Sequence, residues 1–217
     1  MKRFYFSIAL GLMVYSINAQ TFSDYYYQRK AQFEATPDTE DEIILLGNSI
    51  TEGGDWKVLF PNKNVVNRGI SGDVTAGILY RLSEITASRP KKIFLLIGTN
   101  DLARGESESY VVDQVASILQ GIKKESGDTE IFLQSILPVN PAVGEKFSGH
   151  KKNQQLIVSV NNILKELSKS MHIVFIDLHK KFRNPEGVLM SKYTDDGLHL
   201  NEKGYLKWKR VLKPYMK

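Results

Sequence analysis

Four short segments of the sequence carry residue types that acyl-transfer chemistry uses. They contain Ser49, Gly72, Asn100, and the pair Asp196 and His199. A serine hydroxyl is a weak nucleophile, so it needs a base, and the base needs an acid that fixes its tautomer. Because Asp196 and His199 are three residues apart, one loop supplies both. We interpret Ser49 as the nucleophile, His199 as the base and Asp196 as the acid.

Acyl transfer also needs fixed hydrogen-bond donors for the oxyanion that forms on the attacked carbonyl. Gly72 offers a backbone N–H that a substrate can approach closely, and Asn100 offers a neutral side-chain amide. With the backbone N–H of Ser49 they form a candidate oxyanion hole. Each residue alone is more often a turn or cap residue, so the hypothesis depends on their joint occurrence.

The sequence has four histidines, and His179 competes with His199 for the role of base. His179 ends an apolar run two residues after Asp177. We rank it second, because choosing it would leave the Asp-Asp-Gly-Leu-His segment at 195–199 unexplained. His150 and His172 lie near the starts of predicted elements and are interpreted as structural.

Short apolar runs alternate with stretches of helical spacing along the chain. The predicted strands are 42–46, 64–66, 92–97, 130–137 and 172–178. Continuous apolar runs are typical of parallel strands with helices on both faces, so the alternation predicts a doubly wound α/β fold. Ligands of such folds bind beyond the carboxyl ends of the strands. The four candidate segments follow predicted strands and should meet there.

Apolar residues at helical spacing predict the covering helices. The faces are Ile78, Leu82 and Ile85; Val111, Val115, Ile118, Leu119 and Ile122; and Leu156, Val160, Ile163, Leu164 and Leu167. We also expect a leading helix over 25–33 and a final helix from about 202 to 212, with Asn201 as its N-cap. With no repeat or linker, residues 20–217 are interpreted as one domain.

Residues 1–19 have the order of a secretory signal peptide: Lys2 and Arg3, an apolar run over 4–15, and then small or polar residues up to Ala19. The run is shorter than the roughly 20 residues needed to span a bilayer. We therefore expect removal of this segment, export to the periplasm or the medium, and no stable membrane insertion afterwards.

The composition of the 217-residue chain excludes several other classes. Without cysteine there are no disulfides, thiolate metal sites or cysteine nucleophile. The formal net charge of +5 comes from scattered basic pairs, whereas nucleic-acid binding favours a concentrated patch. Neither G-x-x-x-x-G-K-[ST] nor G-x-G-x-x-G opens a helix after a strand, which argues against a nucleotide site. We expect neither a metal nor an organic cofactor.

Taken together, the four segments resemble the SGNH hydrolase superfamily of GDSL-type esterases and lipases. The matching blocks are G-N-S-I-T at 47–51, N-R-G-I-S-G-D at 67–73, G-T-N-D at 98–101 and D-G-L-H at 196–199. The resemblance implies a flavodoxin-like three-layer α/β/α sandwich with a five-stranded parallel sheet of order 2-1-3-4-5. It also implies the same roles for the five residues. The first block departs from Gly-Asp-Ser at Asn48, as in esterases resembling platelet-activating-factor acetylhydrolase and carbohydrate acetylesterases.

We therefore expect a secreted serine esterase that hydrolyses short-chain, chiefly acetyl, O-esters on carbohydrates. Its substrate is a small-molecule or glycan ester. The alternatives are a lysophospholipase or acyl-thioesterase of the same fold, and a non-catalytic secreted carbohydrate-binding module. The loop 139–149 has one large aromatic residue and no long apolar lid, which disfavours an interfacial lipase. Trp56 is a candidate for stacking on a sugar ring, and Arg68 and Arg183 are candidates for contacting an acidic sugar or phosphate.

Overall fold

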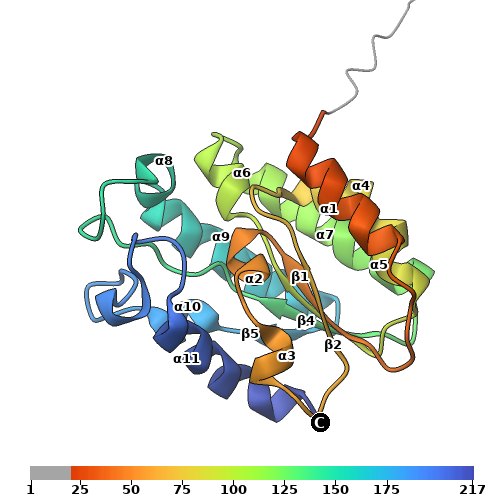
Figure 1. Cartoon of the computed structure of the whole chain (residues 1–217). Helices are drawn as coiled ribbons and strands as arrows, with labels where there is room; N and C mark the ends of the chain where they lie inside the picture. The colour runs from red at the N-terminus through yellow and green to blue at the C-terminus, as the bar shows by residue number, and fades with distance from the viewer. Residues whose placement is uncertain (1–20) are drawn as a thin grey trace, which may run out of the picture.

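The computed structural model describes residues 21–217, and the signal peptide expected at 1–19 lies outside them. In the described residues five parallel strands form one sheet of order β2-β1-β3-β4-β5 (Figure 1). The flavodoxin-like sheet predicted from the sequence is confirmed. The strands are β1 Ile43–Gly47, β2 Val65–Gly69, β3 Lys92–Leu96, β4 Glu130–Gln134 and β5 Val174–Ile176.

Helices cover both faces of the sheet (Figure 1). One face carries α4 (Thr75–Tyr80), α5 (Leu82–Ala87), α7 (Glu108–Glu125) and α9 (Gln154–Ser170). On the other face, α3 (Trp56–Leu59) and α11 (Glu202–Leu212) meet through Trp56 and Trp208, whose ring centroids are 4.8 Å apart. The other helices are α1 (Asp24–Glu34), α2 (Ser49–Glu52), α6 (Thr99–Ala103), α8 (Ser148–Lys151), α10 (Leu178–Phe182) and two 3-10 turns, Ser191–Tyr193 and Lys213–Tyr215.

The central strands and the longest helix form the core that the apolar patterns predicted. β1 and β3 are buried along their whole length, because helices exclude water from both faces of a parallel sheet. The predicted face of α7 is buried at all five positions, and Asn201 caps α11 as expected. Among residues 21–217, no helix combines the length and apolar character that crossing a bilayer requires.

Helix α9 buries a face that differs from the predicted one. Leu156 and Ile163 are 37% and 42% exposed, whereas Ile157 is fully buried. Asn161 occupies a core position, where its side chain accepts the N–H of Ile136 at 2.7 Å and donates to the Ile136 carbonyl at 2.9 Å. These two hydrogen bonds satisfy the Asn161 amide, so this polar side chain can be buried. The helix therefore turns Asn161 toward the sheet in place of Ile163, which the apolar pattern had predicted to be buried.

The helix predicted through 78–85 is divided into α4 and α5 at Arg81, which has φ −108° and ψ 18°. The guanidinium of Arg81 is fully buried. Its Nε and Nη2 donate to the Asp73 carboxylate at 3.2 and 3.0 Å, and Nη2 also donates to the Arg68 carbonyl at 2.9 Å. Since Asp73 directly follows Gly72, this ion pair holds the loop after β2 in place.

Replacement of Arg81 by methionine should destabilise the fold strongly. The change leaves the Asp73 carboxylate buried without its partner, which costs about 3–5 kcal/mol in the free energy of unfolding. Urea denaturation followed by circular dichroism measures this difference. The matched control is Arg89→Met, because the Arg89 side chain is 73% exposed and lies 3.7 Å from Asp128. An exposed pair of this kind contributes about 0–1 kcal/mol, so equal losses in the two variants would contradict the assignment.

Candidate active site

Ser49 lies where β1 turns into α2, at the carboxyl edge of the sheet. Asn48 caps α2, since its Oδ1 accepts the backbone N–H of Ile50 at 3.0 Å. An aspartate carboxylate would accept the same hydrogen bond, so asparagine preserves this turn. The turn leaves Ser49 half-buried, with the backbone N–H at the start of a helix.

The side chains of Ser49, His199 and Asp196 form a continuous hydrogen-bonded chain. Ser49 Oγ lies 2.9 Å from His199 Nε2, although the two residues are 150 positions apart. His199 Nδ1 lies 2.8 Å from Asp196 Oδ2. Because a carboxylate only accepts, Nδ1 carries the proton, and Nε2 of the neutral ring has a lone pair directed at the serine hydroxyl. This geometry suits a nucleophile, its base and an orienting acid.

Asp196 is also held by the backbone of its own loop. Its Oδ1 accepts the N–H groups of Leu198 at 2.9 Å and His199 at 2.8 Å. Burial by itself raises the pKa of the Asp196 carboxyl, but the hydrogen bonds from the His199 ring and from the two N–H groups hold the pKa below its ordinary value. The carboxylate therefore stays ionised near neutral pH and can stabilise an imidazolium.

The turn between Asp196 and His199 requires glycine. Gly197 has φ +83°, and a Cβ there would lie 2.3 Å from the carbonyl oxygen of Asn140. The N–H of Asn140 in turn donates to the Gly197 carbonyl at 2.8 Å. Only glycine allows this close approach, which joins the loop of the base to the segment after β4.

The candidate oxyanion donors follow strands β1, β2 and β3, with Ser49 at the start of α2, Gly72 in a loop and Asn100 in the first turn of α6. Within residues 21–217, the backbone N–H groups of Ser49 and Gly72 donate no hydrogen bond. Gly72 has φ +79°, which favours glycine. Asn100 Nδ2 donates one hydrogen to the Asp73 carbonyl at 2.8 Å, and an amide nitrogen carries two. Two backbone groups and one side-chain N–H are thus available to an oxyanion.

Two residues of the segment between β4 and α9, Phe147 and His150, contact this site. The ring centroid of Phe147 is 5.0 Å from that of His199, with the rings nearly perpendicular. His150, interpreted from sequence as structural, places Nε2 2.9 Å from Asn100 Oδ1. No spacing pattern indicates these contacts, because both depend on how the loop folds over the edge of the sheet.

The structure does not bring the three proposed substrate contacts to the site. Trp56 is 1% exposed and donates its indole N–H to the Thr51 carbonyl at 2.8 Å. Arg68 is 4% exposed and pairs with Glu84 at 2.6 Å. Arg183 lines a separate cavity. The two buried side chains stabilise the fold and present no surface to a substrate.

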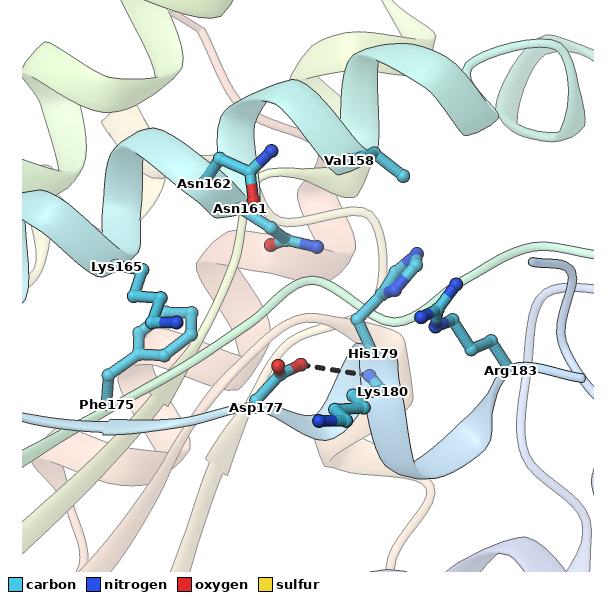
Figure 2. A pocket seen from close by; sticks show the side chains of 9 residues that line it. All are labelled: Val158, Asn161, Asn162, Lys165, Phe175, Asp177, His179, Lys180 and Arg183. Atoms are coloured by element: carbon cyan, nitrogen blue, oxygen red, sulfur yellow. Dashed lines mark hydrogen bonds between the residues drawn. The ribbon is translucent and has the colours of Figure 1, made fainter. Parts of the chain in front are cut away.

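The competing pair, Asp177 and His179, lies in that separate cavity of about 250 Å³ between α9 and α10 (Figure 2). The Asp177 carboxylate accepts the backbone N–H of Lys180 at 2.9 Å, and the His179 ring points away from it (Figure 2). Burial lowers the pKa of His179. No serine lines this cavity, so the pair has no nucleophile to activate.

The described residues contain no group of three or more histidine, aspartate or glutamate side chains arranged to hold a metal ion. At the sheet edge Asp196 and His199 bond to each other. The arrangement offers a hydroxyl, a base and several fixed donors, which is what acyl transfer through a covalent intermediate uses.

Comparison with known proteins agrees with this chemistry. The chain matches the GDSL-like Lipase/Acylhydrolase family over residues 45–207, a range that includes all five candidate residues. The platelet-activating factor acetylhydrolase IB subunit alpha2 of Homo sapiens is 28% identical over 179 residues, which cover 78% of this chain and 73% of that protein.

Two solved structures share the fold. A protein from Streptococcus pneumonia described as a platelet activating factor is 30% identical, with a TM-score of 0.82 and coverage of 89% of this chain and 93% of that one. An acetyl xylan esterase is 19% identical, with a TM-score of 0.68 and coverage of 81% and 100%; this likeness extends to the fold alone. The match over most of the chain shows that the protein belongs to the GDSL-like lipase/acylhydrolase family and is an ester-hydrolysing enzyme.

Proposed function

We propose that the protein is an exported serine esterase that removes acetyl or other short acyl groups from carbohydrate O-esters. The proposed serine esterase mechanism rests on the hydrogen bonds that connect Ser49 to His199 and His199 to Asp196, with distances of 2.9 and 2.8 Å. The proposed export rests on the signal-like order of residues 1–19.

The reaction has two steps. Ser49 Oγ attacks the ester carbonyl while His199 Nε2 takes the hydroxyl proton, and the oxyanion is held by the N–H groups of Ser49 and Gly72 and by Asn100 Nδ2. Collapse of this intermediate transfers the proton from His199 to the leaving alcohol and leaves an acyl-serine. His199 then takes a proton from the water molecule that attacks the acyl-serine. As the second intermediate collapses, His199 returns this proton to Ser49 Oγ and the carboxylic acid leaves.

Three observations support a short acyl group on a large alcohol. Two similar proteins, a platelet-activating factor acetylhydrolase and an acetyl xylan esterase, are named for acetyl esters. The side chains of His199 and Asp196 are 30% and 31% exposed, so the site is open. Residues 141–149 are mostly exposed and include one large aromatic side chain, Phe147. An open rim of this kind suits an acyl substituent on a polymer better than a long apolar chain.

Replacement of Ser49 by alanine should abolish covalent labelling by a fluorophosphonate probe and lower kcat by about 10⁶-fold, because the nucleophile is lost. Gel fluorescence measures the labelling, and hydrolysis of p-nitrophenyl acetate measures the rate. The matched control is Ser170→Ala, which removes an exposed hydroxyl at the end of α9. Labelling that persists in Ser49→Ala, or that is lost in the control, would contradict Ser49 as the nucleophile.

The rate should fall on acidification, since a protonated imidazole cannot take the serine proton. The depressed pKa of Asp196 keeps that carboxylate ionised in mildly acidic solution, so protonation of the histidine base alone is expected to lower kcat/KM about tenfold per pH unit on the acidic side. A profile measured with p-nitrophenyl acetate checks this, with circular dichroism confirming that the protein stays folded. A constant rate down to pH 4 would exclude a histidine base.

Octanoate esters should be cleaved no faster than acetate esters. A buried acyl pocket would gain about 0.8 kcal/mol for every added methylene, and the open rim offers no such gain. The p-nitrophenyl series measures the preference, and acetate release from acetylated xylan tests the carbohydrate part, with Ser49→Ala as the control. A preference for octanoate would instead favour the lysophospholipase or acyl-thioesterase alternative.

A further inference from the structure

Asn100 is the one candidate oxyanion donor that is a side chain, so its direction depends on its neighbours. Nδ2 donates to the Asp73 carbonyl at 2.8 Å, and Oδ1 lies 2.9 Å from His150 Nε2. Because the amide oxygen only accepts, Nε2 must be the donor. Turning the amide over would place its oxygen against the Asp73 carbonyl and its NH₂ group against the N–H of His150. The two partners therefore select one orientation.

The His150 ring is itself held in place. It is half-buried in α8, and the Phe147 ring packs nearly perpendicular to it with centroids 5.8 Å apart. Burial, and then the nearby His199 and Arg104, lower the pKa of His150. The ring is therefore neutral near pH 7, with its single proton on Nε2, where Asn100 accepts it.

We propose that His150 is a positioning residue for the oxyanion hole, holding the Asn100 amide so that its free N–H points at the oxyanion. The inference rests on the proposed esterase function. Donors stabilise a transition state best when their direction is fixed before the reaction, and a hydrogen bond to Oδ1 also polarises the amide and strengthens its N–H as a donor. Without His150, Asn100 keeps one anchor, at Asp73, and can rotate about it.

A double-mutant cycle on p-nitrophenyl acetate tests this role. His150→Leu should lower kcat by about tenfold to a hundredfold, the range expected for a misplaced catalytic group, with little change in KM. His150→Gln should recover most of the rate, because the glutamine amide nitrogen can occupy a position near Nε2. If His150 acts through Asn100, then adding His150→Leu to Asn100→Ala should lower kcat by less than about threefold, since coupled residues are not additive.

Each result decides between positioning and a structural role. Thermal unfolding of all variants shows whether a lost rate reflects a lost fold. The proposal is overturned if His150→Leu keeps the full rate, if the losses in the cycle are additive, or if His150→Gln is as slow as His150→Leu. Fluorophosphonate labelling of the unaltered protein and of Ser49→Ala is compared first. If labelling does not depend on Ser49, the esterase function fails and this inference with it; if it does, an additive cycle rejects the His150 role alone.

Discussion

All five strands of the sheet run in the same direction, so the loops that follow them leave from one edge. The 2.9 Å contact between Ser49 and His199 joins residues 150 positions apart, and it forms only because both segments reach this edge. The strand order reverses at β1, which places the Ser49 turn at the point where such folds have an open crevice. The direction of the strands thus brings the nucleophile and its base together.

Contacts between the loops set their final positions. The Ser71 N–H donates to the Glu52 carboxylate at 2.7 Å, which joins the loop after β2 to the helix that begins with Ser49. The Tyr205 hydroxyl donates to the Ile50 carbonyl at 2.8 Å and joins α11 to the same helix. These two hydrogen bonds fix α2 relative to the loop after β2 and to α11.

The segment after β4 is the part of the site that the sheet alone does not position. Its exposed chain is held by Lys151, which is 7% exposed and donates to the carbonyls of Val143 and Gly144 at 2.6 and 2.8 Å. The anchored loop carries Phe147 beside the base, and α8, which follows it, carries His150 beside the amide of the oxyanion hole. This segment therefore forms one wall of the site beside His199 and supports the Asn100 side chain.

The apolar runs were sufficient to predict a parallel sheet covered by helices, and the strand order followed from the resemblance of the four polar blocks to the SGNH hydrolases. The five candidate residues could be placed at one edge from the sequence, because the carboxyl ends of parallel strands lie on the same edge of a sheet. The sequence could not predict where buried polar groups find partners. Asn161 faces the core because it bonds to Ile136, and Arg81 interrupts a helix because it pairs with Asp73. Trp56 is buried rather than exposed to a sugar, and His150 bonds to Asn100. Each of these depends on a partner distant in sequence, which only the tertiary structure supplies.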